Sequence, residues 1–426
     1  MHLTAFRSGK GDCLILENSK RSARILVDGG MPDAYRKHVA PALAELRKKE
    51  KKLDVVYVSH IDEDHIGGIL AMLDAEVAWR VHKFQKDEGN SKHKEPDAPR
   101  PVAAGKIWHN AFHEQLKKNA GAVEEAIAAA APVLSRADLV EMREAGLEMS
   151  ELVTSIHQAI QVSRRIGKRQ LGIPLNPEAK GKLMMARKGQ KPFNVGGMRV
   201  TVLGPTAKHL ERLRKDWNTW LRDNEKALKE IREKAARGEK SFGTSDVRRL
   251  LRALSLPAEA FGDPSSVTPP NLASLTLLVE EGDESILLTG DARGDQMLDG
   301  LRDAGRLSNG ATLQVNVLKV QHHGSKNNID PEFCDTVIAT DYVFCGNGEQ
   351  HGNPHPDVVE LIAERRRKVD ATNFRFWFNS SEAVEEKQAP AAHMAEIEKL
   401  VRRLAKNSKG RLKFKFLKSG SSLAVT

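Results

Sequence analysis

Short apolar runs separated by turn residues divide the chain into two blocks of predicted strands. The first block lies near the N-terminus, with strands predicted at residues 2 to 6, 12 to 17, 24 to 28 and 53 to 58. The second block has strands predicted at residues 198 to 205, 272 to 279, 285 to 289, 313 to 320, 342 to 344, 374 to 378, 411 to 417 and 422 to 425. Helical periodicity lies between these runs, at residues 33 to 49, 66 to 75, 293 to 306, 356 to 367 and 391 to 407. Strands interleaved with helices in both blocks predict a layered α/β architecture.

The segment between the two blocks has a different character. Aliphatic runs disappear from about residue 88, and helical periodicity continues through alanine-rich and charged stretches. We therefore predict a basic helical insertion at residues 86 to 195, a returning strand at 196 to 206 and a charged helical segment at 207 to 262. Residues 1 to 85 and 263 to 426 are then the two halves of one domain.

A polar stretch with metal-ligand chemistry follows the strand predicted at residues 53 to 58. His60, Asp62 and Asp64 alternate, so on an extended segment their side chains point the same way. His65 joins them as the chain turns, and Gly67-Gly68 permit a tight turn into the next helix. Imidazole and carboxylate ligands together suit a divalent metal ion. The alternative is a polar loop in which Asp62 or Asp64 caps that helix.

Other predicted strands also end in residues that can bind metal. Asp28 precedes Gly29-Gly30, Asp291 follows Gly290, and His322-His323 precede Gly324. Each feature alone is a common turn sequence. Their recurrence at strand ends matters, because ligands of a two-metal site come from several strands at one edge of a scaffold.

These motifs resemble the metallo-β-lactamase-fold hydrolases, and within them the soluble hydrolase domain of the ComEC-type DNA-uptake proteins and its stand-alone relatives. The resemblance covers roughly residues 1 to 85 and 196 to 370. It rests on Asp28 with two glycines, His60-x-Asp62-x-Asp64-His65, Gly290-Asp291, His322-His323-Gly324-Ser325, the N-terminal Gly9-Lys10-Gly11-Asp12, Asn271-x-x-Ser274 and His355-Pro356. Many superfamily members have His at the position of Asp62, and Asp there is typical of the ComEC-like branch.

The resemblance implies an αββα sandwich and a site for two divalent metal ions, zinc or manganese. In our hypothesis His60 and Asp62 hold one ion, Asp64 and His65 hold the other, and Asp291 bridges them. One of His322 and His323 completes the site: we assign His322 as the ligand and His323 as its catalytic neighbour. Asp28 supports a ligand imidazole, and Asp64 also orients the attacking water.

One expected ligand has no evident counterpart. Other superfamily members take a His from the interval between the first motif and Gly290-Asp291. The candidates that we considered in that interval have no recognisable context: His82, His109, His113, His157 and His209.

Several further residues are candidate substrate contacts. Ser325 and Lys326 follow the His-His motif where they can meet a phosphate, and we count Lys326 among the catalytic residues because an ammonium there stabilises an oxyanion. Asn271 and His355 are the other candidates. A solvated surface position explains Lys326 equally well, and His355-Pro356 is also typical of a helix start.

Charge and composition extend this picture to partners and location. The net charge of +10 and pI near 9.3 favour an acidic partner such as nucleic acid, although a solvated basic surface explains them as well. The three cysteines form no paired framework, which indicates a reducing compartment. Residues 1 to 7 lack the apolar segment of a signal peptide, and no run long enough to span a membrane is present. We therefore expect a cytoplasmic protein that does not contact membrane.

Three functions are compatible with these features. The first is a nuclease or related phosphodiesterase acting on DNA or RNA, alone or as the effector of a multi-protein system such as phage defence. The second is a hydrolase of a small phosphodiester or ester, with residues 88 to 195 as a lid. The third is a metal-stabilised scaffold or regulatory protein, in which the insertion binds a protein partner or a second copy of the chain.

Overall fold

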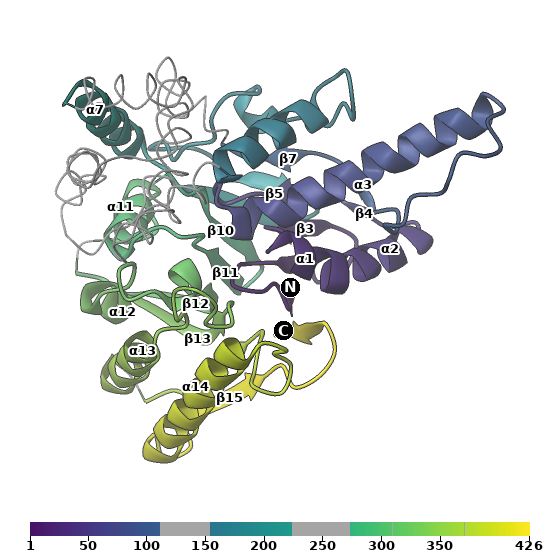
Figure 1. Cartoon of the computed structure of the whole chain (residues 1–426). Helices are drawn as coiled ribbons and strands as arrows, with labels where there is room; N and C mark the ends of the chain where they lie inside the picture. The colour runs from purple at the N-terminus through teal and green to yellow at the C-terminus, as the bar shows by residue number, and fades with distance from the viewer. Residues whose placement is uncertain (111–153, 224–272, 309, 370) are drawn as a thin grey trace, which may run out of the picture.

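The computed structural model describes residues 1 to 110, 154 to 223, 273 to 308, 310 to 369 and 371 to 426. Two β-sheets lie face to face, and helices cover the outer face of each (Figure 1). The predicted α/β sandwich is confirmed. None of the described helices combines the length and apolar composition that a membrane crossing requires.

The first sheet has six strands in the order β16-β1-β2-β3-β5-β7. These strands are β1 (His2–Phe6), β2 (Leu14–Glu17), β3 (Arg24–Val27), β5 (Val55–Tyr57), β7 (Ile107–Trp108) and β16 (Ser422–Ala424). The N-terminal and C-terminal strands pair antiparallel, so the two ends of the chain meet in this sheet.

The second sheet has eight strands in the order β15-β14-β13-β12-β11-β10-β9-β8. These are β8 (Phe193–Val195), β9 (Met198–Gly204), β10 (Thr276–Glu281), β11 (Glu284–Leu288), β12 (Leu313–Lys319), β13 (Val337–Phe344), β14 (Phe374–Phe378) and β15 (Leu412–Phe416). The strands from β11 to β15 are parallel, as buried strands joined by helices usually are. A small separate pair is formed by β4 (Lys52–Leu53) and β6 (Ala103–Ala104).

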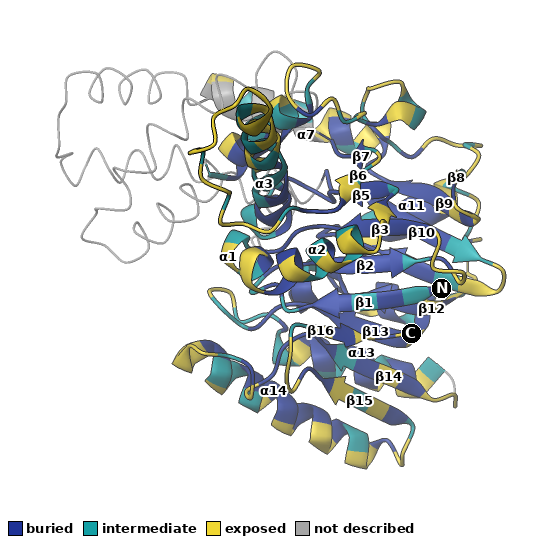
Figure 2. Cartoon of the chain, turned by 90° about the vertical axis from the view of Figure 1, so that its right-hand side faces the viewer, coloured by how far each residue is buried: buried dark blue, intermediate teal, exposed yellow. Residues whose placement is uncertain are grey.

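Alternation of side chains along the strands produces three apolar layers. In the first sheet Leu26 and Val56 face the outer helices, whereas Ile25 and Val55 face the second sheet. In the second sheet Leu318 faces its own outer helices. Figure 2 shows the central strands buried, exposed positions on the outer strands β14 and β15, and helices exposed on one side only. This two-sided burial explains why the strands read as continuous apolar runs.

The helices follow the predicted pattern with a few differences in extent. They are α1 (Pro32–Ala34), a π-helical turn (Tyr35–Val39), α2 (Ala40–Lys48), α3 (Glu63–Asp87), α7 (Ala207–Asp223), α11 (Gly294–Asp303), α12 (Pro331–Thr336), α13 (Pro356–Val369) and α14 (Gln388–Asn407). The short α12, whose N-cap Asp330 accepts from Phe333 N at 2.8 Å, was not predicted.

The helix predicted at residues 66 to 75 is much longer. It begins at Glu63, ends at Asp87 and extends away from the body of the molecule, with its buried residues confined to the first turns (Figure 1). Gly67-Gly68 therefore lie inside the helix and not in a turn before it. A Cβ on Gly68 would lie 2.0 Å from Gly29 O, so this glycine permits close packing of the helix on the loop after β3.

The segment predicted as a helical insertion differs from that prediction where the structure describes it. Residues 154 to 166 are helical, but β7 and β8 also lie in this segment and extend the two sheets. The two-residue β7 is too short for a periodicity signal. Residues 111 to 153 and 224 to 262, including the alanine-rich stretch and most of the charged helical segment, lie outside the described residues.

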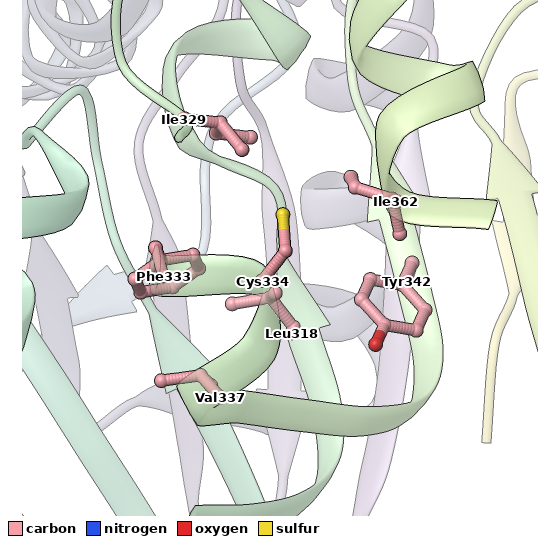
Figure 3. A pocket seen from close by; sticks show the side chains of 7 residues that line it. All are labelled: Leu318, Ile329, Phe333, Cys334, Val337, Tyr342 and Ile362. Atoms are coloured by element: carbon pink, nitrogen blue, oxygen red, sulfur yellow. The ribbon is translucent and has the colours of Figure 1, made fainter. Parts of the chain in front are cut away.

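A small apolar pocket lies in the outer core of the second sheet (Figure 3). Its lining is Leu318, Ile329, Phe333, Cys334, Val337, Tyr342 and Ile362. The Tyr342 hydroxyl there accepts a hydrogen bond from Ala339 N at 3.1 Å. All three cysteines of the chain are buried and free.

Candidate metal centre

The predicted ligand residues meet at one edge shared by the two sheets. Asp28 follows β3 and His60 follows β5, and these strands are parallel neighbours. Asp291 follows β11, and His322 and His323 follow β12, which are also parallel neighbours. Because parallel strands end at the same edge of a sheet, each sheet brings its own residues together, and the packing of the two sheets brings both sets to one place.

The stretch from His60 to His65 changes conformation at Asp62. This residue is the N-cap of α3, with extended backbone angles, and its carbonyl accepts from His65 N and Ile66 N at 2.9 Å. Its side chain makes no cap hydrogen bond and instead lies 3.5 Å from His60 Nε2. Asp64 is therefore in the first helical turn and not on an extended segment. Asp62 therefore occupies the N-cap position without a side-chain cap bond, and its carboxylate lies beside His60.

The Asp291 carboxylate is the centre of the cluster. It is buried, and the Nε2 atoms of four imidazoles surround it. The distances are 3.4 Å to His60, 3.3 Å to His65, 3.5 Å to His322 and 3.7 Å to His323. Both imidazoles of the His-His motif therefore face this carboxylate, where only one was assigned as a ligand.

Asp64 forms a second meeting point in the same cluster. Its carboxylate lies 3.1 Å from His323 Nε2 and 3.9 Å from His65 Nε2. These two ring nitrogens are 3.2 Å apart. The loop before β2 approaches closely here: a Cβ on Gly11 would lie 1.8 Å from Asp64 O.

Two more buried carboxylates lie behind the ligand imidazoles. Asp28 is 3.0 Å from His65 Nδ1 and also accepts from Ser59 N and Ser59 Oγ, each at 2.7 Å. Asp12 is 3.0 Å from His323 Nδ1. Because these contacts involve Nδ1, both carboxylates lie on the side of the ring opposite to Asp291 and Asp64. They fix the tautomer that leaves Nε2 free to bind metal.

Sequence reasoning assigned no role to three residues of this site. Ser59 directly precedes the first motif, and its hydroxyl also lies 3.0 Å from His60 Nδ1. Asp12 stood in the quoted Gly-x-Gly-Asp motif. Lys319 pairs with Asp12 across the two sheets. The available signal for Lys319 was a charged residue at the position where the alternation of Val315 and Val317 with Gln314 and Asn316 predicts a buried apolar side chain.

The turn that carries the His-His motif has an uncommon backbone. His322 and His323 have φ of 43° and 56°, in the left-handed region. Asn328 supports the turn, because its Nδ2 donates to Asp291 O at 2.7 Å and its Oδ1 lies 2.8 Å from His322 Nδ1. Such strain occurs where a site holds side chains in set positions.

Electrostatic coupling in the cluster keeps its acids charged. Burial alone would raise the pKa of Asp291, but the four imidazoles outweigh burial and hold this pKa well below its usual range. Burial and the neighbouring His65 would lower the pKa of His60, yet Asp291 and Asp62 raise it to about 9. Burial lowers the pKa of His322, the most exposed of the four imidazoles.

The donor set fits divalent metal ions. Two buried atoms at its centre, His60 Nε2 and Asp291 Oδ1, have no hydrogen-bond partner in the described part of the chain. Buried polar atoms normally have partners, and a bound cation would satisfy both. Imidazole nitrogens and carboxylate oxygens suit zinc or manganese.

The predicted substrate contacts lie around this cluster. Ser325 is buried, and its Oγ accepts from Asn327 N at 3.3 Å. Lys326 is exposed. His355 N donates to Gly324 O at 3.0 Å, and His355 Nδ1 accepts from Asp357 N at 3.2 Å, which is a helix-capping contact. Asn271 lies outside the described residues.

Of the histidines between the two motifs, the structure places His109 beside the cluster. It follows β7, the neighbour of β5, and both of its buried ring nitrogens lack a hydrogen-bond partner among the described residues. Burial lowers its pKa to about 4, with smaller influences from Asp28 and His60. His82 lies near the far end of α3 and His209 lies in α7. His157 is exposed, and His113 lies outside the described residues.

Comparisons with known proteins agree with this fold. Residues 8 to 168 match the model of the metallo-beta-lactamase superfamily, a range that contains Asp12, Asp28 and the first motif. The chain is 31% identical over 114 residues to the ComE operon protein 3 of Bacillus subtilis (strain 168). That match covers 26% of this chain and only 13% of the relative.

Proposed function

We propose that this chain, which carries a metallo-beta-lactamase superfamily domain, is a metal-dependent phosphodiesterase that cleaves DNA or RNA. The observation that carries the proposal is the position of Asp291, whose carboxylate faces four imidazoles at the shared edge of two sheets. Burying carboxylates and imidazoles together at strand ends lowers the stability of the fold unless they bind a ligand such as a metal ion.

The residues divide between two metal positions. His60 and Asp62 would hold one ion, and Asp64, His65 and His323 the other, with Asp291 between them. This assignment exchanges the roles first given to the two adjacent histidines, because His323 Nε2 and not His322 Nε2 lies beside Asp64. Two bound divalent ions would lower the pKa of a coordinated water and neutralise charge on a phosphoryl oxygen.

The side chains themselves orient and hold the reactants. Asp64 is in reach to accept a hydrogen bond from the attacking water, since its side chain is partly exposed. His322 has a side chain that is 22% exposed, the largest value among the four imidazoles, so we assign it to substrate contact. Lys326 and Ser325, on the same turn, are the proposed phosphate contacts.

The choice of nucleic acid as substrate has two supports. The net charge of +10 favours a polyanion. The match to ComE operon protein 3 agrees with the resemblance to DNA-uptake hydrolases, although it covers a small part of that protein. Binding through phosphate contacts should make activity fall steeply with added salt.

A direct test compares cleavage of labelled single-stranded and double-stranded DNA and RNA, with manganese or zinc, by the wild type, Asp64→Ala and Glu63→Gln. Glu63 is the matched control, because its carboxylate is adjacent in sequence but accepts from Gln158 Nε2 at 3.0 Å, away from the cluster. We expect the wild type and Glu63→Gln to cut and Asp64→Ala to be inactive. If only a small chromogenic phosphodiester is cut, the nuclease proposal is wrong and the small-substrate hydrolase takes its place.

A further inference from the structure

The buried pair of Asp12 and Lys319 links the two sheets at the candidate metal centre. Lys319 is the last residue of β12, and its side chain is only 2% exposed. It lies on the same strand face as Val317, which packs in the core between the sheets. Asp12 comes from the loop before β2 in the first sheet. Their ion pair therefore joins elements that are more than 300 residues apart in the sequence.

The Asp12 carboxylate divides its two oxygens between two partners. One oxygen lies 3.0 Å from His323 Nδ1, and the other pairs with the Lys319 ammonium. A charged carboxylate can only accept, so Nδ1 of His323 carries the proton. Nε2 of the same ring is the atom left to face the centre, and it lies 3.1 Å from Asp64 and 3.2 Å from His65 Nε2.

The Lys319 ammonium also reaches the second carboxylate of the centre. Its Nζ lies 3.4 Å from Gly290 O and 4.0 Å from Asp291 Oδ1. It donates hydrogen bonds and has no lone pair, so it contributes positive charge without acting as a metal ligand. Three buried or nearly buried carboxylates, from Asp12, Asp64 and Asp291, are thus balanced by one fixed cation in addition to the imidazoles.

Stability alone is a poor explanation for this pair. Removing two charges from water offsets much of their attraction, and well-packed apolar residues often replace a buried ion pair without loss. A role in setting the position of other groups accounts for it better, because each charge of the pair also contacts a residue of the cluster.

We infer that Asp12 and Lys319 form a positioning pair that holds His323 with Nε2 directed to the metal and fixes Asp291 between the two sheets. This inference rests on the proposed metal centre. It predicts that the pair acts on metal affinity and not only on folding.

The test separates these two effects with a double-mutant cycle. Asp12→Asn, Lys319→Met and the double variant are prepared free of metal, and the affinity for manganese alone and for zinc alone is measured by calorimetry. The melting temperature of each metal-free variant is measured in parallel. Each single variant leaves the other member of the pair buried without its opposite charge. The double variant removes both charges and nearly keeps the size of both side chains, so we expect it to fold.

We expect the double variant to recover most of the melting temperature lost in the single variants, while its metal affinity stays about 10-fold to 100-fold below the wild type. Asp341→Asn is the matched control. Asp341 is also buried, lies in the same sheet and pairs with Arg375 at 2.6 Å away from the cluster. This control should lose stability and keep wild-type metal affinity.

Two results would overturn the inference in distinguishable ways. If Asp12→Asn and the double variant bind manganese and zinc as tightly as the wild type, the pair is structural and the metal centre itself stands. If the wild type binds neither ion, both the positioning role and the metal centre are wrong.

Discussion

Two carboxylate–imidazole pairs support the candidate metal centre, and they differ in what surrounds the carboxylate. Among the described residues, Asp28 contacts His65 in α3 and otherwise accepts from the neutral donors of Ser59, which follows β5 of the first sheet. Asp12 contacts His323 and a full positive charge on Lys319, both from the second sheet. The same His–carboxylate geometry is thus built once from the first sheet and its helix α3, and once across the interface of the two sheets.

This difference indicates how each half of the centre is held. The Asp28 pair depends on one short parallel strand pairing, between β3 and β5. The Asp12 pair depends on the docking of the sheets, and its ion pair is also part of that docking. We therefore expect variants of the two pairs to have similar effects on metal binding and different effects on folding.

The largest effect should come from Asp291, which the imidazoles of both pairs face. Asp291→Ala removes the carboxylate that faces all four imidazoles, so we expect metal affinity to fall more than about 100-fold, beyond the range typical of supporting residues. Nucleic-acid cleavage should disappear with it. Calorimetry and the cleavage assay check this. An affinity within a few-fold of the wild type would remove Asp291 from the centre of the site.

The comparison itself is tested by Asp12→Asn against Asp28→Asn in metal-free protein. Asp12→Asn leaves the buried Lys319 ammonium uncompensated, which costs about 3 to 5 kcal/mol of unfolding free energy. Asp28→Asn leaves neutral donors of Ser59 partly unsatisfied, which costs about 1 to 3 kcal/mol. Urea denaturation measures both values. Equal losses, or the reverse order, would show that the charge on Lys319 does not distinguish the pairs.

The rise in melting temperature that metal binding produces should depend on pH. In metal-free protein the pKa of His60 is raised from 6.5 to about 9, so its protonation stabilises the fold below pH 6.5, and this contribution is lost as the pH rises through 9. Metal requires the unprotonated ring, so metal competes with this proton at low pH. We expect the rise in melting temperature on adding manganese to be larger at pH 9 than at pH 6. An equal rise at both values would mean that no imidazole proton is displaced.

A smaller change should follow from Ser59→Ala. This variant removes the hydroxyl that donates to Asp28 and contacts His60 Nδ1, and it keeps the carboxylate and both imidazoles, so we expect a loss of about 1 kcal/mol in unfolding free energy. Metal affinity should fall only a few-fold. A loss as large as that of Asp12→Asn would show that neutral donors matter as much as the buried cation.

The smallest effect is expected at Lys326. Its side chain is exposed, so Lys326→Ala should leave stability and metal affinity at their wild-type values. If it contacts phosphate, KM for nucleic acid should rise while metal binding stays unchanged. A fall in metal affinity would contradict its assignment to the substrate.

The residues of this site that lie close together in the sequence were predictable from it, and those that meet only when the two sheets pack were not. The stretch from His60 to His65 and the motif at His322 were recognisable because their ligand-type residues are adjacent in sequence and follow apolar runs. Lys319 was not recognisable, because only the docking of the two sheets shows that its side chain meets Asp12. The two-residue β7, which places His109, has no periodicity that a pattern can reveal.

The fold itself was predictable at the level of layers and less so at element boundaries. Buried strands read as apolar runs, and most appear where they were expected. The start of α3 was misplaced because the carboxylates of its first turn were interpreted as belonging to an extended segment, although acidic residues also favour a helix N-terminus.

The most direct test of the metal centre is a titration of metal-free protein with manganese or zinc, followed by native mass spectrometry of the wild type and Asp291→Ala. We expect the wild type to retain two ions per chain and Asp291→Ala, still folded by circular dichroism, to lose them. A wild type that retains no ion, or an Asp291→Ala variant that retains both, would contradict it.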